Sequence, residues 1–171
     1  MRGLYIGRFQ PYHLGHQAVL EKIAEEVEEI LIVIGSAQES HTPENPFTGG
    51  ERMDMIYAAL GESNLRERSI VTPLQDIQRN SVWVSHLQSM VPRFDVVYSN
   101  NPLVIQLISE AGIQIRKSPM FQRDLYSGTA IRKLMREKCD WSKLVPPAVA
   151  AFIEEKGGVE RLISVSKSDS D

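Results

Sequence analysis

The sequence predicts an α/β fold, a doubly wound parallel sheet with a helical C-terminal part. Residues 30–34 read Ile-Leu-Ile-Val-Ile and stop at Gly35, which is typical of a parallel strand buried on both faces. Residues 14–28 place apolar side chains at helical spacing. Further apolar runs and helical segments alternate along the 171 residues, a length that suits one domain. We therefore expect a single domain over residues 1–165.

Local signals predict the other elements. Further apolar runs predict strands at residues 4–6, 69–74, 95–98 and 113–117. Thr48 and Glu51 form a capping box, Pro102 and Pro146 stand where helices open, and Ser127 stands as an N-cap. With apolar spacing, these signals predict helices at residues 48–60, 82–90, 102–111, 127–138 and 146–156.

Two segments are expected to lack regular structure. Residues 36–47 are polar, contain two prolines and show no periodicity. They are expected to form a long loop, and long loops in compact domains are often functional. Residues 164–171 are mostly Ser, Asp and Lys and are expected to fray, with a disordered tail over 166–171.

Composition and charge exclude several classes of function. With 19 Lys and Arg against 22 Asp and Glu, the chain lacks the basic excess of a nucleic-acid binder. Its single cysteine, Cys139, cannot form an internal disulfide, which suits a reducing cytoplasm. No apolar run approaches the roughly 20 residues of a membrane helix, and the strand pattern begins too early for a signal peptide. We expect a cytoplasmic protein that binds neither nucleic acid nor a membrane.

Three side chains that can carry positive charge follow the first expected strand. Arg8, His13 and His16 lie after Gly7, where the strand ends and a helix begins. Ligands of parallel sheets bind beyond the carboxyl ends of the strands, and a helix N-terminus adds N–H donors. The pattern therefore predicts a phosphate site. Two other interpretations stay open: a zinc site formed by the two histidines, or histidines that only cap the helix and pack in the core.

A second polar cluster begins the helix expected after residue 127. Ser127 and Thr129 offer short hydroxyl groups, and Gly128 admits close approach to free backbone N–H groups. Arg132 lies three residues beyond Thr129, on the same helical face. These residues predict a second phosphate-binding helix start. The alternative is an ordinary serine N-cap beside a surface arginine.

Together the two clusters resemble the paired motifs of the nucleotidylyltransferase superfamily. His-x-Gly-His at residues 13–16 is similar to its first motif, whose histidines contact the ATP phosphates and stabilise charge in the transition state. The resemblance gives that role to His13 and His16. Ser-x-Thr-x-x-Arg at residues 127–132 is similar to the second motif, which grips the β and γ phosphates.

A finer resemblance, over residues 2–163, is to the archaeal-type nicotinamide mononucleotide (NMN) adenylyltransferases. It rests on residues 7–13, 35–38, 45–52, 75–77, 80–84, 98–104, 123–129 and 158–161. The resemblance implies a Rossmann-like nucleotidylyltransferase fold and transfer of an adenylyl group from ATP to NMN in NAD biosynthesis, with release of pyrophosphate. It also implies a homo-oligomer, a hexamer by analogy with relatives.

With the family in view, two sets of binding residues join the catalytic candidates His13, His16, Arg8 and Arg132. The candidates for the ATP phosphates and adenosine are Gly7, Phe9, Asn101, Ser127, Gly128 and Thr129. The candidates for NMN are Asp76, Asn80, Trp83 and Phe121. An aromatic face suits the positive charge of nicotinamide, and the polar pair can bond ribose hydroxyls and the carboxamide. Without the family, a core tryptophan and a turn-capping aspartate are the better interpretations.

The expected mechanism needs no general base, because the NMN phosphate is already ionised at neutral pH. We expect direct in-line attack on the α-phosphorus of ATP, helped by positioning and electrostatic stabilisation. His13 and His16 would donate to the α-phosphate and bridging oxygens, Arg8 would hold the two phosphates together, and Arg132 would bind the leaving phosphates. A Mg²⁺ ion is expected to be held mainly by substrate phosphates and water, with no metal site on the protein.

The chain departs from the family pattern at two positions, and two rival functions stay open. Glu44 replaces an arginine of some relatives, so a phosphate contact could be lost, and Asn100 replaces a common glycine. Asn tolerates positive φ, so the turn is expected to survive. One rival is the same chemistry on phosphopantetheine, a flavin mononucleotide or nicotinate mononucleotide. The other is a non-catalytic nucleotide sensor, which could dispense with His13 and His16.

Overall fold

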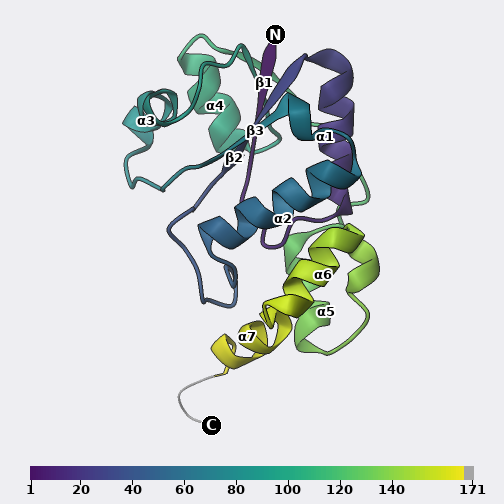
Figure 1. The fold of residues 1–171 in the computed structure, drawn as a ribbon. Coiled ribbons are helices and arrows are strands. Elements are labelled where there is room, and N and C mark those ends of the chain that lie inside the picture. Colours follow the sequence, from purple (N-terminus) through teal and green to yellow (C-terminus); the bar gives the residue numbers. More distant parts are fainter. Residues whose placement is uncertain (168–171) are drawn as a thin grey trace.

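The computed structural model describes residues 1–167 (Figure 1). Five parallel strands form one sheet in the order β3-β2-β1-β4-β5. The strands are β1 (Arg2–Gly7), β2 (Glu29–Ile34), β3 (Ser69–Pro73), β4 (Val96–Tyr98) and β5 (Gln114–Arg116). The chain runs from β1 outward to β3 and then returns to place β4 on the other side of β1. This order confirms the predicted doubly wound α/β fold.

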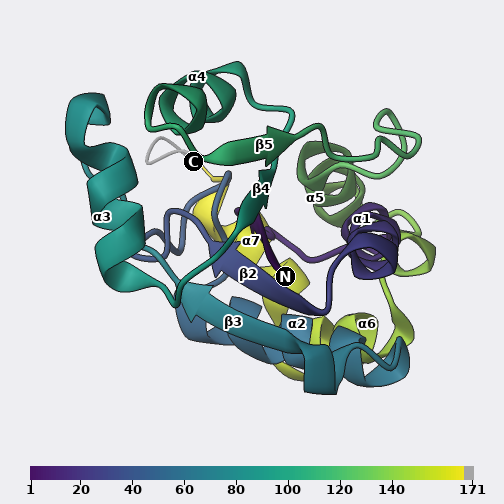
Figure 2. The same ribbon diagram turned by 90° about the horizontal axis from the view of Figure 1, so that it is seen from above.

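The seven α-helices described are divided between the two faces of the sheet. They are α1 (Leu14–Glu26), α2 (Gly49–Glu62), α3 (Trp83–Met90), α4 (Pro102–Glu110), α5 (Gly128–Arg136), α6 (Pro147–Glu155) and α7 (Gly158–Val165). Helices α3 and α4 cover one face, and the others cover the opposite face (Figure 2). Pro146 is the N-cap of α6 rather than its first residue, and the other predicted boundaries differ from the observed ones by at most two residues.

Strand β2 shows why the apolar runs were informative. Ile30, Ile32 and Ile34 point into the larger core beneath α1, α2 and α5 to α7. Leu31 and Val33 point into the smaller core beneath α3 and α4. All five side chains are fully buried, as expected for a central parallel strand covered on both faces.

Helix α7 corrects the expectation that the chain frays from residue 164. Ser164 and Val165 are helical, and the Ser166 hydroxyl donates to Leu162 O at 2.7 Å. The helix is held by a fully buried Leu162 and by Gly158, where an added Cβ would lie 2.6 Å from the Phe47 ring. In the predicted tail, residues 166 and 167 close this helix, and residues 168–171 lie outside the described residues.

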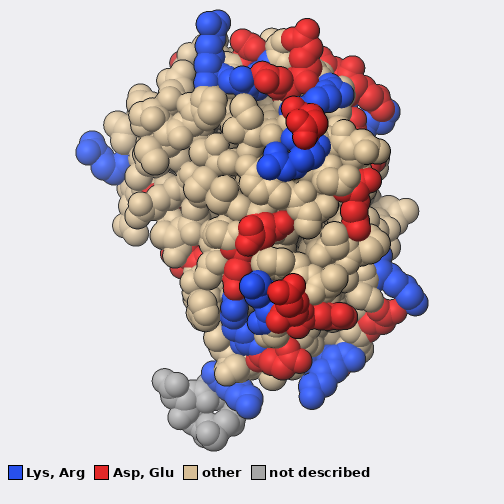
Figure 3. All heavy atoms as spheres, viewed as in Figure 1, with Lys and Arg blue, Asp and Glu red and all other residues tan. Residues whose placement is uncertain are grey.

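Charged side chains of both signs are mixed on one face of the molecule. Figure 3 shows Lys and Arg side chains interspersed with Asp and Glu on the face it presents. Within residues 1–167, the helices are too short or too polar for any of them to span a membrane.

Candidate functional site

A cleft of about 520 Å³ opens at the carboxyl ends of β1 and β4, where the sheet order reverses direction. This is the position at which open α/β sheets bind ligands. Segments far apart in the sequence line it, because β1, β4, the start of α1 and the start of α5 meet here. Ten of the predicted site residues lie along this cleft: Arg8, Phe9, His13, His16, Asn101, Phe121, Ser127, Gly128, Thr129 and Arg132.

The two histidines form a reciprocal cap at the start of α1. The His16 backbone N–H donates to His13 Nδ1 at 3.3 Å, and the His13 backbone N–H donates to His16 Nδ1 at 3.2 Å. Their rings stack with centroids 3.6 Å apart. The pattern is a capping box in which two histidines replace the usual hydroxyl and carboxylate. The structure therefore confirms that both histidines cap the helix, as one of the sequence interpretations stated.

This cap also decides where the ring protons lie. A neutral imidazole that accepts through Nδ1 carries its proton on Nε2, so each ring keeps an Nε2–H donor. Phe9 holds the His16 ring edge-on at a centroid distance of 4.7 Å, and Tyr12 lies 5.5 Å away. His13 and His16 thus reach the cleft with fixed orientations, and within residues 1–167 no acceptor binds either Nε2–H group.

Both histidines are neutral at physiological pH. Burial lowers the pKa of His13 from 6.5 to about 4. Burial, and then the neighbouring His13, lower the pKa of His16 well below its usual value. Their interpretation as sources of positive charge was therefore wrong, because desolvation in the helix cap outweighs any gain from ionisation. They can still stabilise an anion as neutral hydrogen-bond donors.

The unfolding free energy is expected to fall as the pH is lowered from 6.5 towards 4. Between these values the unfolded chain binds a proton on His13 that the folded protein does not bind. Acidification therefore favours unfolding, and full protonation at His13 should cost on the order of 3 kcal/mol. Urea unfolding at a series of pH values measures the effect.

The matched controls are two asparagine substitutions. His13→Asn keeps an N-cap acceptor and should reduce the pH dependence, leaving the part that His16 contributes. His41→Asn, in an exposed part of the 36–47 loop, should leave the pH dependence as it is in the unaltered protein. An identical pH dependence for His13→Asn and the unaltered protein would contradict the assignment to His13.

The start of α5 brings the second motif against the first. Ser127 is the N-cap, and its hydroxyl accepts from the Ala130 N–H at 3.1 Å. Arg132 donates through Nη1 to Gln10 O at 2.7 Å and through Nη2 to the Thr129 hydroxyl at 3.5 Å. An added Cβ at Gly128 would lie 2.8 Å from Arg132 Nη1, so glycine is required for this packing.

Arg132 is buried, which differs from the surface arginine of the alternative interpretation. Only 8% of the residue is exposed, and Nε has no hydrogen-bond partner among the described residues. Burial lowers its pKa to about 10, the charges of Arg8 and Arg136 act in the same direction, and Glu44 opposes them. Arg132 stays charged at neutral pH. Glu44, which replaces an arginine of some relatives, therefore acts on the same positive site.

Three further predicted residues have specific local roles. The Asn101 side chain accepts from the N–H groups of Leu103 and Val104, so it caps α4 beside the cleft. Gly7 lies at the end of β1, where an added Cβ would come within 3.0 Å of the Phe9 ring. Asn100 does not adopt positive φ, so the turn does not need a glycine there; its amide donates to Ser118 O.

The residues predicted for NMN do not all meet. Phe121 lines the cleft with the ATP candidates, whereas Asp76, Asn80 and Trp83 do not. Asp76 follows β3 and accepts from the Ser36 N–H at 3.2 Å, at the end of β2. Trp83 begins α3 and packs in part against the smaller core. The core interpretation of Trp83 is correct in part, because the side chain is partly buried against the smaller core. The capping interpretation of Asp76 is correct in part, because its carboxylate accepts from the backbone where β2 ends.

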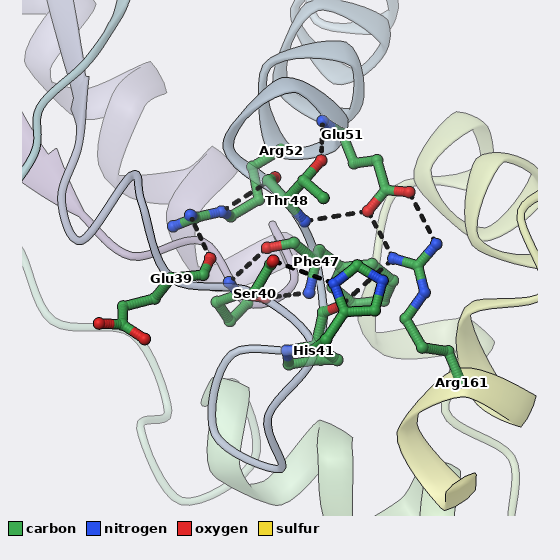
Figure 4. A network of polar contacts seen from close by, with 10 residues as sticks. Glu39, Ser40, His41, Phe47, Thr48, Glu51, Arg52 and Arg161 are labelled. Atoms are coloured by element: carbon green, nitrogen blue, oxygen red, sulfur yellow. Dashed lines mark hydrogen bonds and ion pairs between the residues drawn. The ribbon is translucent and has the colours of Figure 1, made fainter. Parts of the chain in front are cut away.

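Sequence reasoning missed a set of polar residues that hold the loops around the cleft. The Gln10 amide donates to Phe47 O at 2.8 Å and accepts from Phe47 N at 2.9 Å. Arg161 of α7 pairs with Glu51 in the predicted capping box of α2 (Figure 4). Arg52 is fully buried in the same region. Gln10, Arg52 and Arg161 lie in segments that resemble the family, and this resemblance was the sequence feature that could have identified them.

The described residues contain no set of side chains that could bind a metal ion without the substrate. Residues 1–167 contain no group of three or more His, Cys, Asp or Glu side chains placed to hold a metal ion. The two histidines also use Nδ1 for the helix cap. The zinc interpretation therefore lacks the third ligand that such a site needs.

Comparisons with known proteins give a consistent relationship. The Cytidylyltransferase-like family model matches residues 4–134. A nicotinamide-nucleotide adenylyltransferase from Methanothrix thermoacetophila is 60% identical over 98% of this chain and 98% of its own length. A protein of the same name from Haloarcula marismortui is 55% identical over 99% of this chain and 89% of its own length.

A solved structure supports the fold independently. A bifunctional NMN adenylyltransferase/ADP ribose pyrophosphatase from Francisella tularensis, complexed with AMP and a manganese ion, is similar with a TM-score of 0.79. The similarity covers 95% of this chain and 52% of that chain at 18% sequence identity. At this identity the comparison shows a shared fold.

Proposed function

We propose that this chain, which belongs to the cytidylyltransferase-like family, is a nicotinamide-nucleotide adenylyltransferase of NAD biosynthesis. The enzyme transfers the adenylyl group of ATP to NMN, forming NAD and pyrophosphate. Relatives with this name match nearly the whole chain at 52 to 60% identity. The structural observation that carries the proposal is the cleft in which two neutral histidine donors and Arg132 of α5 line the same space.

The ATP phosphates are proposed to lie between the starts of α1 and α5. Both helix starts direct backbone N–H groups and a partial positive charge towards the cleft. Arg132 would bind the β and γ phosphates, together with Ser127 and Thr129. Arg8, an exposed cation at the end of β1, would hold the NMN phosphate near the α-phosphate of ATP against their mutual repulsion.

The reaction is a displacement at phosphorus. An NMN phosphate oxygen attacks the α-phosphorus as the bond to the bridging oxygen of pyrophosphate breaks, so no proton transfer is required. Nε2–H of His13 and His16 would donate to the α-phosphate and the bridging oxygen, where negative charge increases in the transition state. Because both rings are neutral and fixed, this stabilisation does not depend on histidine ionisation near pH 7.

Magnesium is proposed to enter as part of the nucleotide substrate. The ion would be held mainly by phosphate oxygens and water, the ligands that Mg²⁺ usually keeps when it binds with a nucleotide. The chain's own residues then bind and orient the MgATP complex.

The nicotinamide side is proposed to extend from the cleft towards the end of β2. Asp76 lies at that strand end through its bond to the Ser36 N–H. Asn80 and Trp83 follow on the same connection, and Phe121 would contact the nucleotide from the cleft. Nicotinate mononucleotide, which carries an additional carboxylate, is the nearest competing acceptor. We further propose a cytoplasmic enzyme that assembles as a homo-oligomer, a hexamer by family resemblance.

The first test is NAD formation by the purified chain from ATP, Mg²⁺ and NMN, followed with a coupled dehydrogenase. We expect NAD and pyrophosphate in equal amounts. If NAD does not form, the same mixture is tested with nicotinate mononucleotide, a flavin mononucleotide and phosphopantetheine, with pyrophosphate as the readout. Release with another acceptor would replace NMN, and tight nucleotide binding without release would favour the sensing module instead.

A further inference from the structure

Arg52, in the first turn of α2, is a buried cation whose hydrogen bonds within residues 1–167 all go to backbone carbonyl groups. The residue is fully buried and forms no ion pair with a carboxylate of the described residues. Its guanidinium is surrounded by six carbonyl oxygens, at 2.9 to 3.3 Å. These belong to Arg8, Gly35, Ser36, Ala37, Glu39 and Thr48. Figure 4 shows its guanidinium directed at Glu39 and away from the Glu51–Arg161 pair.

Two of these carbonyls have a special position in the chain. Nη1 of Arg52 donates to both of them, to Arg8 O at 2.9 Å and to Gly35 O at 3.0 Å. The next residues, Phe9 and Ser36, adopt left-handed φ values of 53° and 48°. This conformation is unfavourable for residues with a Cβ, so it must be held by its surroundings. One guanidinium nitrogen therefore holds the peptide group before each left-handed residue.

The two held peptides lie at the carboxyl ends of neighbouring strands. Gly7 of β1 pairs with Ile34 of β2, so the chain leaves both strands at the same level. The β1 end carries the Arg8 side chain and the Phe9 ring that contacts His16. The β2 end carries the Ser36 N–H that donates to Asp76. Arg52 thus joins the segment facing the ATP candidates to the segment facing the NMN candidates.

We propose that Arg52 is a positioning residue that fixes the ends of β1 and β2 relative to each other and so sets the place of Arg8 for adenylyl transfer. The inference rests on the proposed function but adds a residue that touches neither substrate. Burial, and then the nearby charge of Arg8, lower the pKa of Arg52 to about 10, so the group stays charged at neutral pH. Its N–H groups are all directed at carbonyls, which leaves positioning as its contribution.

Lysine is the informative substitution, because it keeps the charge but cannot reach both strand ends at once. We expect Arg52→Lys to lower kcat at least about tenfold, since small displacements of positioned groups are costly in catalysis. The matched control is Arg68→Lys. Arg68 also donates to backbone carbonyls, those of Ala24, Val27 and Glu28, at the opposite end of the sheet. Its variant should keep kcat within about twofold.

A double-mutant cycle separates positioning from general stabilisation. If Arg52 acts through Arg8, Arg52→Lys should cost several-fold less in kcat when Arg8→Ala is already present. The proposal would be overturned if Arg52→Lys lowered kcat by the same factor with and without Arg8→Ala, while circular dichroism showed that the single and double variants are folded. The unaltered protein is assayed alongside. Its failure to make NAD would reject the proposed function, whereas normal activity of Arg52→Lys would reject only this inference.

A second pair of variants tests the same geometry if Arg52→Lys does not fold. Ser36→Asn keeps a residue that tolerates the left-handed conformation, and Ser36→Val introduces a β-branched side chain that does not. We expect Ser36→Val to lower kcat/KM for NMN at least about tenfold relative to Ser36→Asn. Equal values for the two variants would show that the held strand end is not needed, and would overturn the proposal.

Discussion

Replacing His16 by alanine is expected to lower kcat at least about a hundredfold, the effect of removing one preorganised donor to a developing negative charge. His16 is held by the reciprocal cap with His13 and by the Phe9 ring, and its Nε2–H is the group left for the substrate. Because the pKa of His16 lies well below its usual value, the loss should be similar across neutral pH. Steady-state assays of NAD formation measure it.

Two amide substitutions separate the donor from the cap. Asparagine at residue 16 places its amide near the position of Nδ1, so His16→Asn can preserve the bond from the His13 N–H. Glutamine reaches closer to the position of Nε2 and can supply a donor to the cleft. We expect His16→Asn to retain stability but not activity, and His16→Gln to recover part of kcat. Near-normal turnover of the alanine variant would contradict the role assigned to Nε2–H.

The fold was predictable because its signals are local. A central parallel strand must be apolar on both faces, so residues 30–34 were recognisable without any knowledge of their neighbours. The capping box at Thr48 and Glu51 is likewise a pattern within four residues. Helix α7 was missed because its stability comes from distant contacts, the packing of Gly158 against Phe47 and the Arg161–Glu51 ion pair.

The site was predictable only where side chains themselves form the pattern. The motifs around His13 and Arg132 were found because their residue types and spacing suggest phosphate binding. Their protonation states were not, because burial in a folded helix start decides whether a histidine is charged. Arg52 and Gln10 act on backbone groups of other segments, and a backbone carbonyl has no sequence signature. Their roles become visible only when the tertiary structure brings those segments together.

Replacing Arg132 by lysine is expected to lower kcat/KM for ATP about a hundredfold, as expected for losing two charge-assisted hydrogen bonds. Nη1 of the guanidinium is bound to Gln10 O and Nη2 to the Thr129 hydroxyl, so the group is held in a fixed position at the cleft. An ammonium group cannot bond the carbonyl and two phosphate oxygens in the same geometry. Initial-rate kinetics with ATP varied at saturating NMN measure the effect.

The proposed division of the cleft makes this effect selective. If Arg132 binds the β and γ phosphates, inhibition by pyrophosphate should weaken in parallel with kcat/KM for ATP, while the KM for NMN stays within about twofold. Arg136→Lys, on the same helix but exposed, is the control and should change neither value. A change confined to the KM for NMN would place Arg132 on the acceptor side. Because the bond to Gln10 O fixes the position of the guanidinium, the β and γ phosphates of ATP would then have to lie at the other end of the cleft.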